Sequence, residues 1–171
     1  MAAMVSMALG SDLSGSELAR QGLATDPFNY GQARILVESI QDLIAAADNA
    51  RTDRELVDML ARQVGHLHIY DPIDALGVSM AAIHFTDGDP LRSIIIAANN
   101  RTLDDDGKLV RLRDVDSSAG IAGALAGALR GIDAFPADWV DDALRANRQQ
   151  YGIDIEANAR GLRDVIYASG R

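Results

Sequence analysis

Helix-start signals recur along most of this sequence, and they constrain its fold more than any other feature. The signals are of two kinds, capping-box spacing and an Asp-Pro pair that suits an N-cap followed by the first helical position. They stand at Ser14 to Glu17, Thr52 to Glu55, Asp71-Pro72 and Asp89-Pro90. Apolar residues follow with helical spacing, as in a helix predicted from about Gln32 with Leu36, Ile40, Leu43, Ile44 and Ala47 on one face.

Further signals extend this pattern to the end of the chain. Pro136 precedes a helical repeat that includes Val140 and Leu144, and a last helix carries Ile155, Ala159, Leu162 and Ile166 on one face. Eight or so helices with short connections predict an all-α fold in which a parallel sheet has no place. The length of 171 residues suits one domain over 1–171.

One stretch, residues 99–116, departs from the helical pattern. Two short apolar pairs flank the dipeptide Asp106-Gly107, which is typical of a β-hairpin with a type I′ turn. We therefore expect a small hairpin near 102–112. The run Asp104–Asp106 is interpreted as a solvated turn, because the ligand spacing of a twelve-residue calcium loop is absent.

Charge and composition exclude several classes of function. With 16 basic and 25 acidic residues the formal net charge is −9, which disfavours binding to nucleic acid or to an anionic membrane surface. The chain has no cysteine, no apolar run long enough to span a bilayer, and no basic segment before its apolar start. We expect a soluble, cytoplasmic protein with no nucleic-acid or membrane partner.

The segment 113–131 is the one that carries chemistry. It joins Asp114-Val115-Asp116-Ser117 to a helix in which positions 120, 123, 124, 127 and 128 are all Gly or Ala, interpreted as a tightly packed core face. Asp116 or Ser117 could act as the N-cap of this helix. Only one residue can hold the cap, so a carboxylate remains to be explained. Oxygen donors this close together suit a hard cation such as Mg²⁺.

These residues resemble the C-terminal signature of the ADP-ribosylglycohydrolase family. In that signature an Asp-x-Asp-Thr/Ser cluster precedes a helix of small residues, then a short loop, a proline and a Trp-bearing helix. Here the cluster 114–117 is followed by Ile121 through Gly131 and then by Phe135-Pro136-Ala137-Asp138-Trp139. The resemblance spans roughly Gly65 to Leu162 and is most specific over 114–136.

The resemblance implies a fold and an activity. The fold of the family is an all-α orthogonal helical bundle, and its reaction is Mg²⁺-dependent hydrolysis of a glycosidic bond at ADP-ribose, using a pair of ions. By resemblance, Asp114, Asp116 and Ser117 are metal ligands. The implied substrate is an ADP-ribosylated protein or a related ADP-ribose derivative.

The chain also departs from the family pattern. The family's N-terminal Thr-Asp-Asp cluster, the catalytic Glu that some members carry in that half, and the glycine-rich substrate loop have no counterpart here, so the catalytic residue stays unassigned. The chain therefore resembles the C-terminal half of a member, with the remaining ligands supplied by an N-terminal-half chain or by self-association. Serine at 117 replaces the usual threonine, and the stretch 99–113 is longer than usual.

Two other functions remain open at this point. A non-catalytic helical binding module would use Asp114 and Asp116 only as helix caps. A phosphatase of the haloacid-dehalogenase type would use Asp114 as nucleophile, but that fold needs βαβ units that this sequence does not predict. The three histidines, His66, His68 and His84, lack metal-type partners at helical spacing; His66 and His68 could line a pocket.

Overall fold

The computed structural model describes residues 1–25 and 34–169, and within them it divides the chain into two compact units, Met1–Ala134 and Phe135–Arg171. Each unit is described by itself. The predicted start of a helix near Gln32 lies outside the described residues, and so does the side chain of Ile166. The sequence-based prediction of a single domain over 1–171 stays a prediction.

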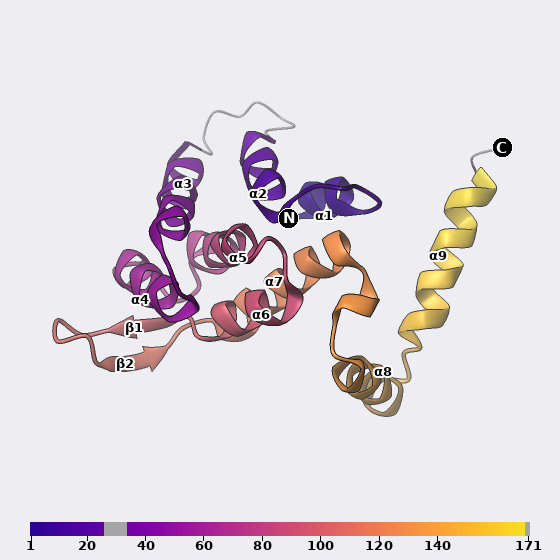
Figure 1. Cartoon of the computed structure of the whole chain (residues 1–171). Coiled ribbons are helices and arrows are strands. Elements are labelled where there is room, and N and C mark those ends of the chain that lie inside the picture. Colours follow the sequence, from indigo (N-terminus) through magenta and orange to yellow (C-terminus); the bar gives the residue numbers. More distant parts are fainter. Residues whose placement is uncertain (26–33, 170–171) are drawn as a thin grey trace. The chain divides into compact units, whose positions relative to one another are not determined.

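The first unit contains helices α1 to α7, one hairpin and a short 3₁₀ turn, in the chain order shown in Figure 1. Their bounds are α1 Ala2–Ala8, α2 Gly15–Ala24, α3 Arg34–Asn49, α4 Asp53–Val64, α5 Pro72–Thr86, α6 Pro90–Ala98, β1 Arg101–Leu103, β2 Leu109–Leu112, α7 Val115–Arg130 and η1 Ile132–Ala134. The all-α fold with one small hairpin is confirmed. In the described residues the two strands form the only sheet, and they run antiparallel.

The helix starts follow the sequence signals closely. At α2 both halves of the capping box form, since the Ser14 hydroxyl accepts from the Glu17 amide and the Glu17 carboxylate accepts from the Ser14 amide. Asp71 and Asp89 cap α5 and α6, each followed by proline at the first helical position.

The signal at Thr52 is confirmed only in part. Thr52 accepts from the Glu55 amide, but the Glu55 carboxylate accepts from the amide of Arg51 instead of Thr52. One half of the expected capping box therefore forms at the start of α4.

Helix α5 is the centre of the first unit. It packs against α2, α3, α6 and α7, and its sequence is apolar almost all round, as expected for a helix enclosed on every side. One core cluster, with α4 and α6, packs on one face of α5, and a second, with α1 and α2, packs on another face. Helices α3 and α7 contribute to both clusters.

Asp87 joins three helices at the end of α5. Its backbone is left-handed, with φ of 53°, and it ends the helix as the C-cap. Its carboxylate accepts from the Gly15 amide at the start of α2 at 2.8 Å and from Arg130 of α7 at 3.0 Å. The starts and ends of distant helices are thus fixed at one point.

The second unit contains α8 Ala137–Tyr151 and α9 Ile155–Ser169, with Pro136 as the N-cap of α8. Arg148 of α8 pairs with Glu156 at 2.9 Å and with Asp154 at 3.2 Å, which ties the end of α8 to the start of α9.

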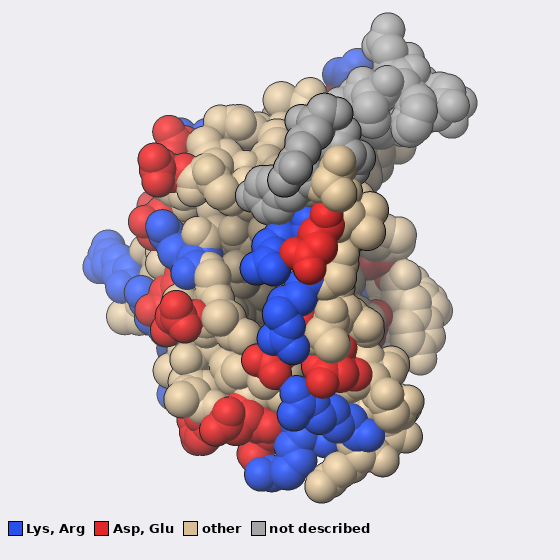
Figure 2. Space-filling model, turned by 90° about the vertical axis from the view of Figure 1, so that its right-hand side faces the viewer, with Lys and Arg blue, Asp and Glu red and all other residues tan. Residues whose placement is uncertain are grey.

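On the face shown in Figure 2, basic and acidic side chains are interleaved. No helix among the described residues is long and apolar enough to cross a membrane.

Helix α7 does not bury the face that its sequence suggested. Its buried residues are Ser118, Ala122, Leu125 and Ala126, whereas Gly120 and Ala124 are exposed. The interpretation of the Gly/Ala positions as a tightly packed core face is therefore wrong for these two. Ala122, Leu125 and Ala126 lie in the two core clusters, and the other small positions, Gly123, Gly127 and Ala128, are half-buried.

Glycine-to-alanine substitutions should separate close packing from open surface. A Cβ on Gly15 would lie 2.3 Å from the Ile83 carbonyl oxygen and 2.7 Å from the Gly88 amide, both rigid backbone atoms, while at Gly120 nothing lies within 4 Å. We expect Gly15→Ala to lower the free energy of unfolding by about 1–3 kcal/mol, and Gly120→Ala to raise it by up to about 1 kcal/mol. Urea unfolding measures both; equal effects would contradict the packing of α2 on α5.

Candidate metal site at the start of α7

The hairpin leads directly into the candidate site. Arg101 pairs with Leu112 and Thr102 with Arg111, and the amide of Arg113 donates to the Asn100 carbonyl at 3.1 Å, which closes the base of the hairpin. The amide of Asp104 donates to Lys108, and that of Gly107 to Asp104. Two ends of the segment 100–113 are thereby brought together beside α7.

The turn differs in type from the prediction. A type I′ turn needs positive φ at both Asp106 and Gly107, but only Gly107 adopts it, at 78°. The loop has three residues between Asp104 and Lys108, as in a type I turn followed by a left-handed glycine. Asp104 uses its carboxylate to accept from the Lys108 amide at 2.7 Å, which favours this longer loop. The acidic tip is exposed, as expected.

Arg113 lies buried immediately before the candidate ligands. Its Nε donates to Asp74 Oδ2 at 2.7 Å, and neither side chain of this pair is exposed. Its Nη1 donates to Thr102 at 3.1 Å, and its Nη2 donates to the carbonyls of Leu67 and His68 at 3.0 and 3.1 Å. One side chain therefore joins the hairpin, the start of α5 and the loop before α5.

A second set of hydrogen bonds connects the same aspartate to α7. Asn100 donates to the free oxygen of Asp74 at 2.8 Å and lies 3.5 Å from the Ser118 hydroxyl. That hydroxyl donates to the Asp114 carbonyl at 2.9 Å, and the Ser118 carbonyl accepts from Ser79 of α5 at 2.8 Å. Buried polar groups are usually paired; here the Asn100 amide nitrogen is paired, whereas its Oδ1 is buried without a hydrogen-bond partner.

The N-cap of α7 is Asp114, although its side chain makes no capping hydrogen bond. The expectation that Asp116 or Ser117 caps the helix is wrong, because the amide of Ser118 already bonds to the Asp114 carbonyl at 3.1 Å. Asp116 and Ser117 lie in the first turn, exposed, and Asp114 is half-buried. The three predicted ligands therefore follow one another at the open, positive end of a helix, where carboxylates are favoured.

The two carboxyl groups interact with each other. The pKa of Asp116 is lowered, first by a hydrogen bond with the Asp114 side chain and then by the backbone amides of Asp116 and Ser117. Asp116 therefore loses its proton more readily than an isolated aspartic acid does. Two carboxyl groups and a hydroxyl in this arrangement fit the oxygen ligands that Mg²⁺ takes. Residues 1–25 and 34–169 contain no group of three or more His, Cys, Asp or Glu side chains that could hold a metal ion.

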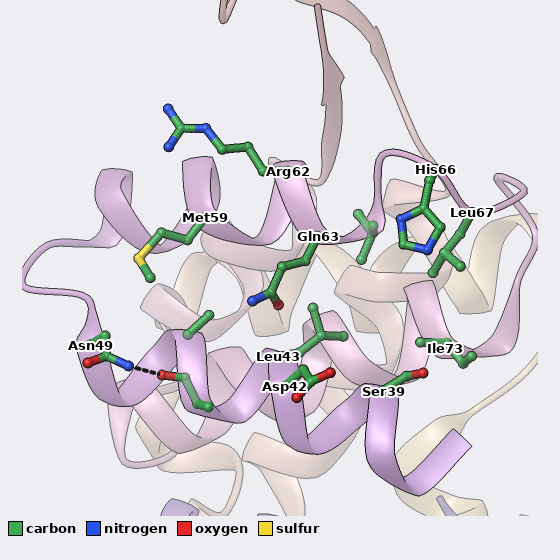
Figure 3. Close-up of a pocket in the computed structure, with 13 residues that line it drawn as sticks. Ser39, Asp42, Leu43, Asn49, Met59, Arg62, Gln63, His66, Leu67 and Ile73 are labelled. Carbon is green, nitrogen blue, oxygen red and sulfur yellow. Dashed lines mark hydrogen bonds between the residues drawn. The ribbon is translucent and has the colours of Figure 1, made fainter. Parts of the chain in front are cut away.

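A separate cavity of about 600 Å³ lies between α3 and α4 (Figure 3). His66 lines it, as the sequence suggested, but His68 does not and instead lies beside the Tyr70 ring. Gln63 points from α4 toward α3, with its Oε1 buried and unpaired, while Arg62 points away from the cavity. The third histidine, His84, is 2.6 Å from Asp48 and has a structural contact between α5 and α3. None of the three predicted ligands lines this cavity.

Comparison with known proteins places the chain. The family model described as ADP-ribosylglycohydrolase matches residues 1–170. The chain belongs to the ADP-ribosylglycohydrolase family. The match reaches beyond the region 65–162 in which the resemblance was identified. No curated protein and no solved structure matches this ADP-ribosylglycohydrolase-family chain.

The sequence analysis gave no role to Arg113, Asp74 or Asn100, although these residues bond to one another beside the candidate site. A signal was available for Asp74, which is the only ionisable residue in the first three turns of an otherwise apolar helix. Charged residues are almost never fully buried unless they are paired, so this position implied a cationic partner.

Removing Asp74 should destabilise the first unit strongly. Asp74→Ala leaves the buried Arg113 without its counter-charge, and we expect the free energy of unfolding to fall by about 3–5 kcal/mol. Asp53→Ala, which removes the exposed partner of Arg92, serves as the control and should cost no more than about 1 kcal/mol. Urea unfolding measures the free energy of unfolding of both variants. Similar losses in the two would mean that the buried Arg113–Asp74 pair stabilises the fold no more than the exposed Arg92–Asp53 pair.

The lowered pKa of Asp116 has a measurable consequence. The pKa of Asp116 is lower in the folded chain than in the unfolded chain. Ionised Asp116 therefore stabilises the fold at pH values above its unfolded pKa, and this stabilisation is lost as the pH falls through its folded pKa. We expect Asp114→Ala to move the Asp116 titration upward toward the ordinary range, because the first cause of the shift is removed. Carboxyl-carbon NMR measures the midpoint, and an unchanged midpoint would contradict the contact between the two side chains.

Proposed function

We propose that this chain supplies a Mg²⁺-binding cluster, Asp114, Asp116 and Ser117, to a hydrolase that cleaves the glycosidic bond of ADP-ribosylated protein or of a related ADP-ribose derivative. Membership of the ADP-ribosylglycohydrolase family supports the class of reaction. The observation that carries the assignment to these residues is their position: Asp114 is the N-cap of α7, and Asp116 and Ser117 lie exposed in its first turn.

The cluster fits a hard dication by the chemistry of its donors. Carboxylates and hydroxyls are oxygen ligands of the type that Mg²⁺ selects, and the exposed position leaves room for water and substrate. When bound, a pair of Mg²⁺ ions would hold the ribose hydroxyls, orient water and stabilise charge as the glycosidic bond breaks. The chain's own contribution is to place Asp114 at the N-cap of α7 and Asp116 and Ser117 in its exposed first turn.

The proposal includes a source of further ligands. Two carboxylates and one hydroxyl provide fewer oxygen atoms than the six of an octahedral Mg²⁺ site, and two ions need more still. We infer that an N-terminal-half chain or a second copy of this chain completes the site. A second copy would make activity per molecule rise with protein concentration. A cytoplasmic location is part of the same proposal.

The test is release of ADP-ribose from a panel of ADP-ribosyl-arginine, ADP-ribosyl-serine and O-acetyl-ADP-ribose, with Mg²⁺ or with EDTA. We expect release only with Mg²⁺. Asp116→Asn should lower it by more than about 100-fold, since loss of a ligand outweighs the ~10–100-fold effect of changing a residue outside the ligand set. The matched control is Asp106→Asn, the same change at an exposed carboxylate of the hairpin tip, which should leave release unchanged.

The opposite result is equally definite. If no substrate releases ADP-ribose at any protein concentration, completion of the site by a second copy of this chain is wrong. If release occurs in EDTA, or survives Asp116→Asn, the assignment of the metal ligands is wrong. Retained binding of ADP-ribose without release would favour the alternative function, a non-catalytic helical binding module.

A further inference from the structure

Arg113 is bonded from every side although it is not itself a ligand candidate. It directly precedes Asp114 in the chain, and its guanidinium contacts Asp74, Thr102 and two backbone carbonyls at 2.7 to 3.1 Å. Its amide bonds to the Asn100 carbonyl, and its carbonyl accepts from the Val115 amide at 2.9 Å. The backbone on both sides of Asp114 is therefore fixed by contacts of its neighbours.

Asp74 reaches the same residue by a second route. Through Asn100 it connects to the Ser118 hydroxyl, which donates to the carbonyl of Asp114. The two routes meet at Asp114 from its N-terminal and C-terminal sides. Both begin at one buried carboxylate, because one oxygen of Asp74 accepts from Arg113 and the other from Asn100.

Stability alone does not account for such a pair. Removing two charges from water costs several kcal/mol per ion, and apolar residues of the same volume are often at least as stable. The planar guanidinium of Arg113 donates to several acceptors at once, and these bonds fix its orientation. The pair is also neutral as a whole, so Asp74 cancels a positive charge that would otherwise repel a cation held by the next residue.

We propose that Arg113 and Asp74 are positioning residues that order the segment 114–118 and so hold the ligands Asp114, Asp116 and Ser117 for Mg²⁺; the metal part of this inference rests on the proposed function. Mg²⁺ demands nearly ideal octahedral geometry, so small displacements of a ligand weaken its binding. Changes to residues that orient metal ligands typically lower metal affinity about 10–100-fold.

The experiment compares Arg113→Lys with Arg101→Lys in the full chain. Lysine keeps the positive charge beside Asp74, but its single ammonium cannot reach Thr102 and the two carbonyls together. Arg101, whose Nη2 is 2.5 Å from Asp58, lies on β1 of the adjoining hairpin, and the same change there serves as the matched control. Ser118→Ala, which removes only the hydroxyl bond to Asp114, covers the case in which Arg113→Lys fails to fold.

Two readouts are taken beside the melting temperature. Amide hydrogen exchange at Ser118 is measured relative to Ala126 of the same helix, and Mn²⁺ affinity is measured by electron paramagnetic resonance, with Mn²⁺ as the probe for Mg²⁺. We expect Arg113→Lys to speed exchange at Ser118 at least about tenfold relative to Ala126 and to weaken Mn²⁺ binding about 10–100-fold. Ser118→Ala should act in the same direction, and Arg101→Lys should change neither ratio by more than about twofold.

The two readouts separate the two claims. If exchange at Ser118 stays within about twofold in both Arg113→Lys and Ser118→Ala, the positioning role is overturned, whatever Mn²⁺ does. If exchange quickens while Mn²⁺ affinity stays unchanged, the pair does not act on the ligands and the proposal is likewise overturned. If the unaltered chain binds no Mn²⁺ at all, the metal function fails, and the exchange result alone decides whether the pair orders the segment.

Discussion

The buried ion pair between Arg113 and Asp74 is the interaction on which the arrangement of the candidate site depends. It joins the end of the hairpin to the first turn of α5, and α5 is the helix around which the first unit is built. Neither side chain of this pair is exposed, so separating the two charges would leave each of them buried without a partner, at a large cost in free energy. The pair therefore fixes the position of the segment that leads into α7. The ligand candidates follow within four residues of that point.

A division of labour follows along the chain. Arg113 and Ser118 face inward: the guanidinium of Arg113 donates to Asp74 of α5, and the Ser118 hydroxyl donates to the Asp114 carbonyl. Asp116 and Ser117, which lie between them in the chain, are exposed. Asp114 lies at the boundary: its carbonyl accepts from the Ser118 hydroxyl, and its side chain is half-buried. Members of the ADP-ribosylglycohydrolase family are hydrolases, and in this member an exposed acidic cluster directly follows the buried Arg113. The hairpin stands directly beside this cluster, since its last strand runs into Arg113.

Much of the fold could be predicted because its signals are local. The caps at Ser14, Asp71 and Asp89 depend on side chains that bond to amides two or three residues away, so the sequence contains both partners of each contact. The hairpin was predictable for the same reason, but its turn was not. Whether Asp106 adopts positive φ depends on how Asp104 bonds across the loop. The exposed Gly/Ala positions of α7 were misread because a run of small residues fits a close-packed face and an open face equally well.

The sequence by itself determined that this chain is a set of capped helices with one hairpin, and that Asp114, Asp116 and Ser117 stand together, because these are relations between neighbours in the chain. Only the tertiary structure decided what surrounds them. Arg113 and Asp74 are 39 residues apart, and no local pattern pairs one arginine with one of many aspartates. Folding determines which aspartate pairs with Arg113, because burial removes water and each charge can then pair only with a group that packing brings close to it.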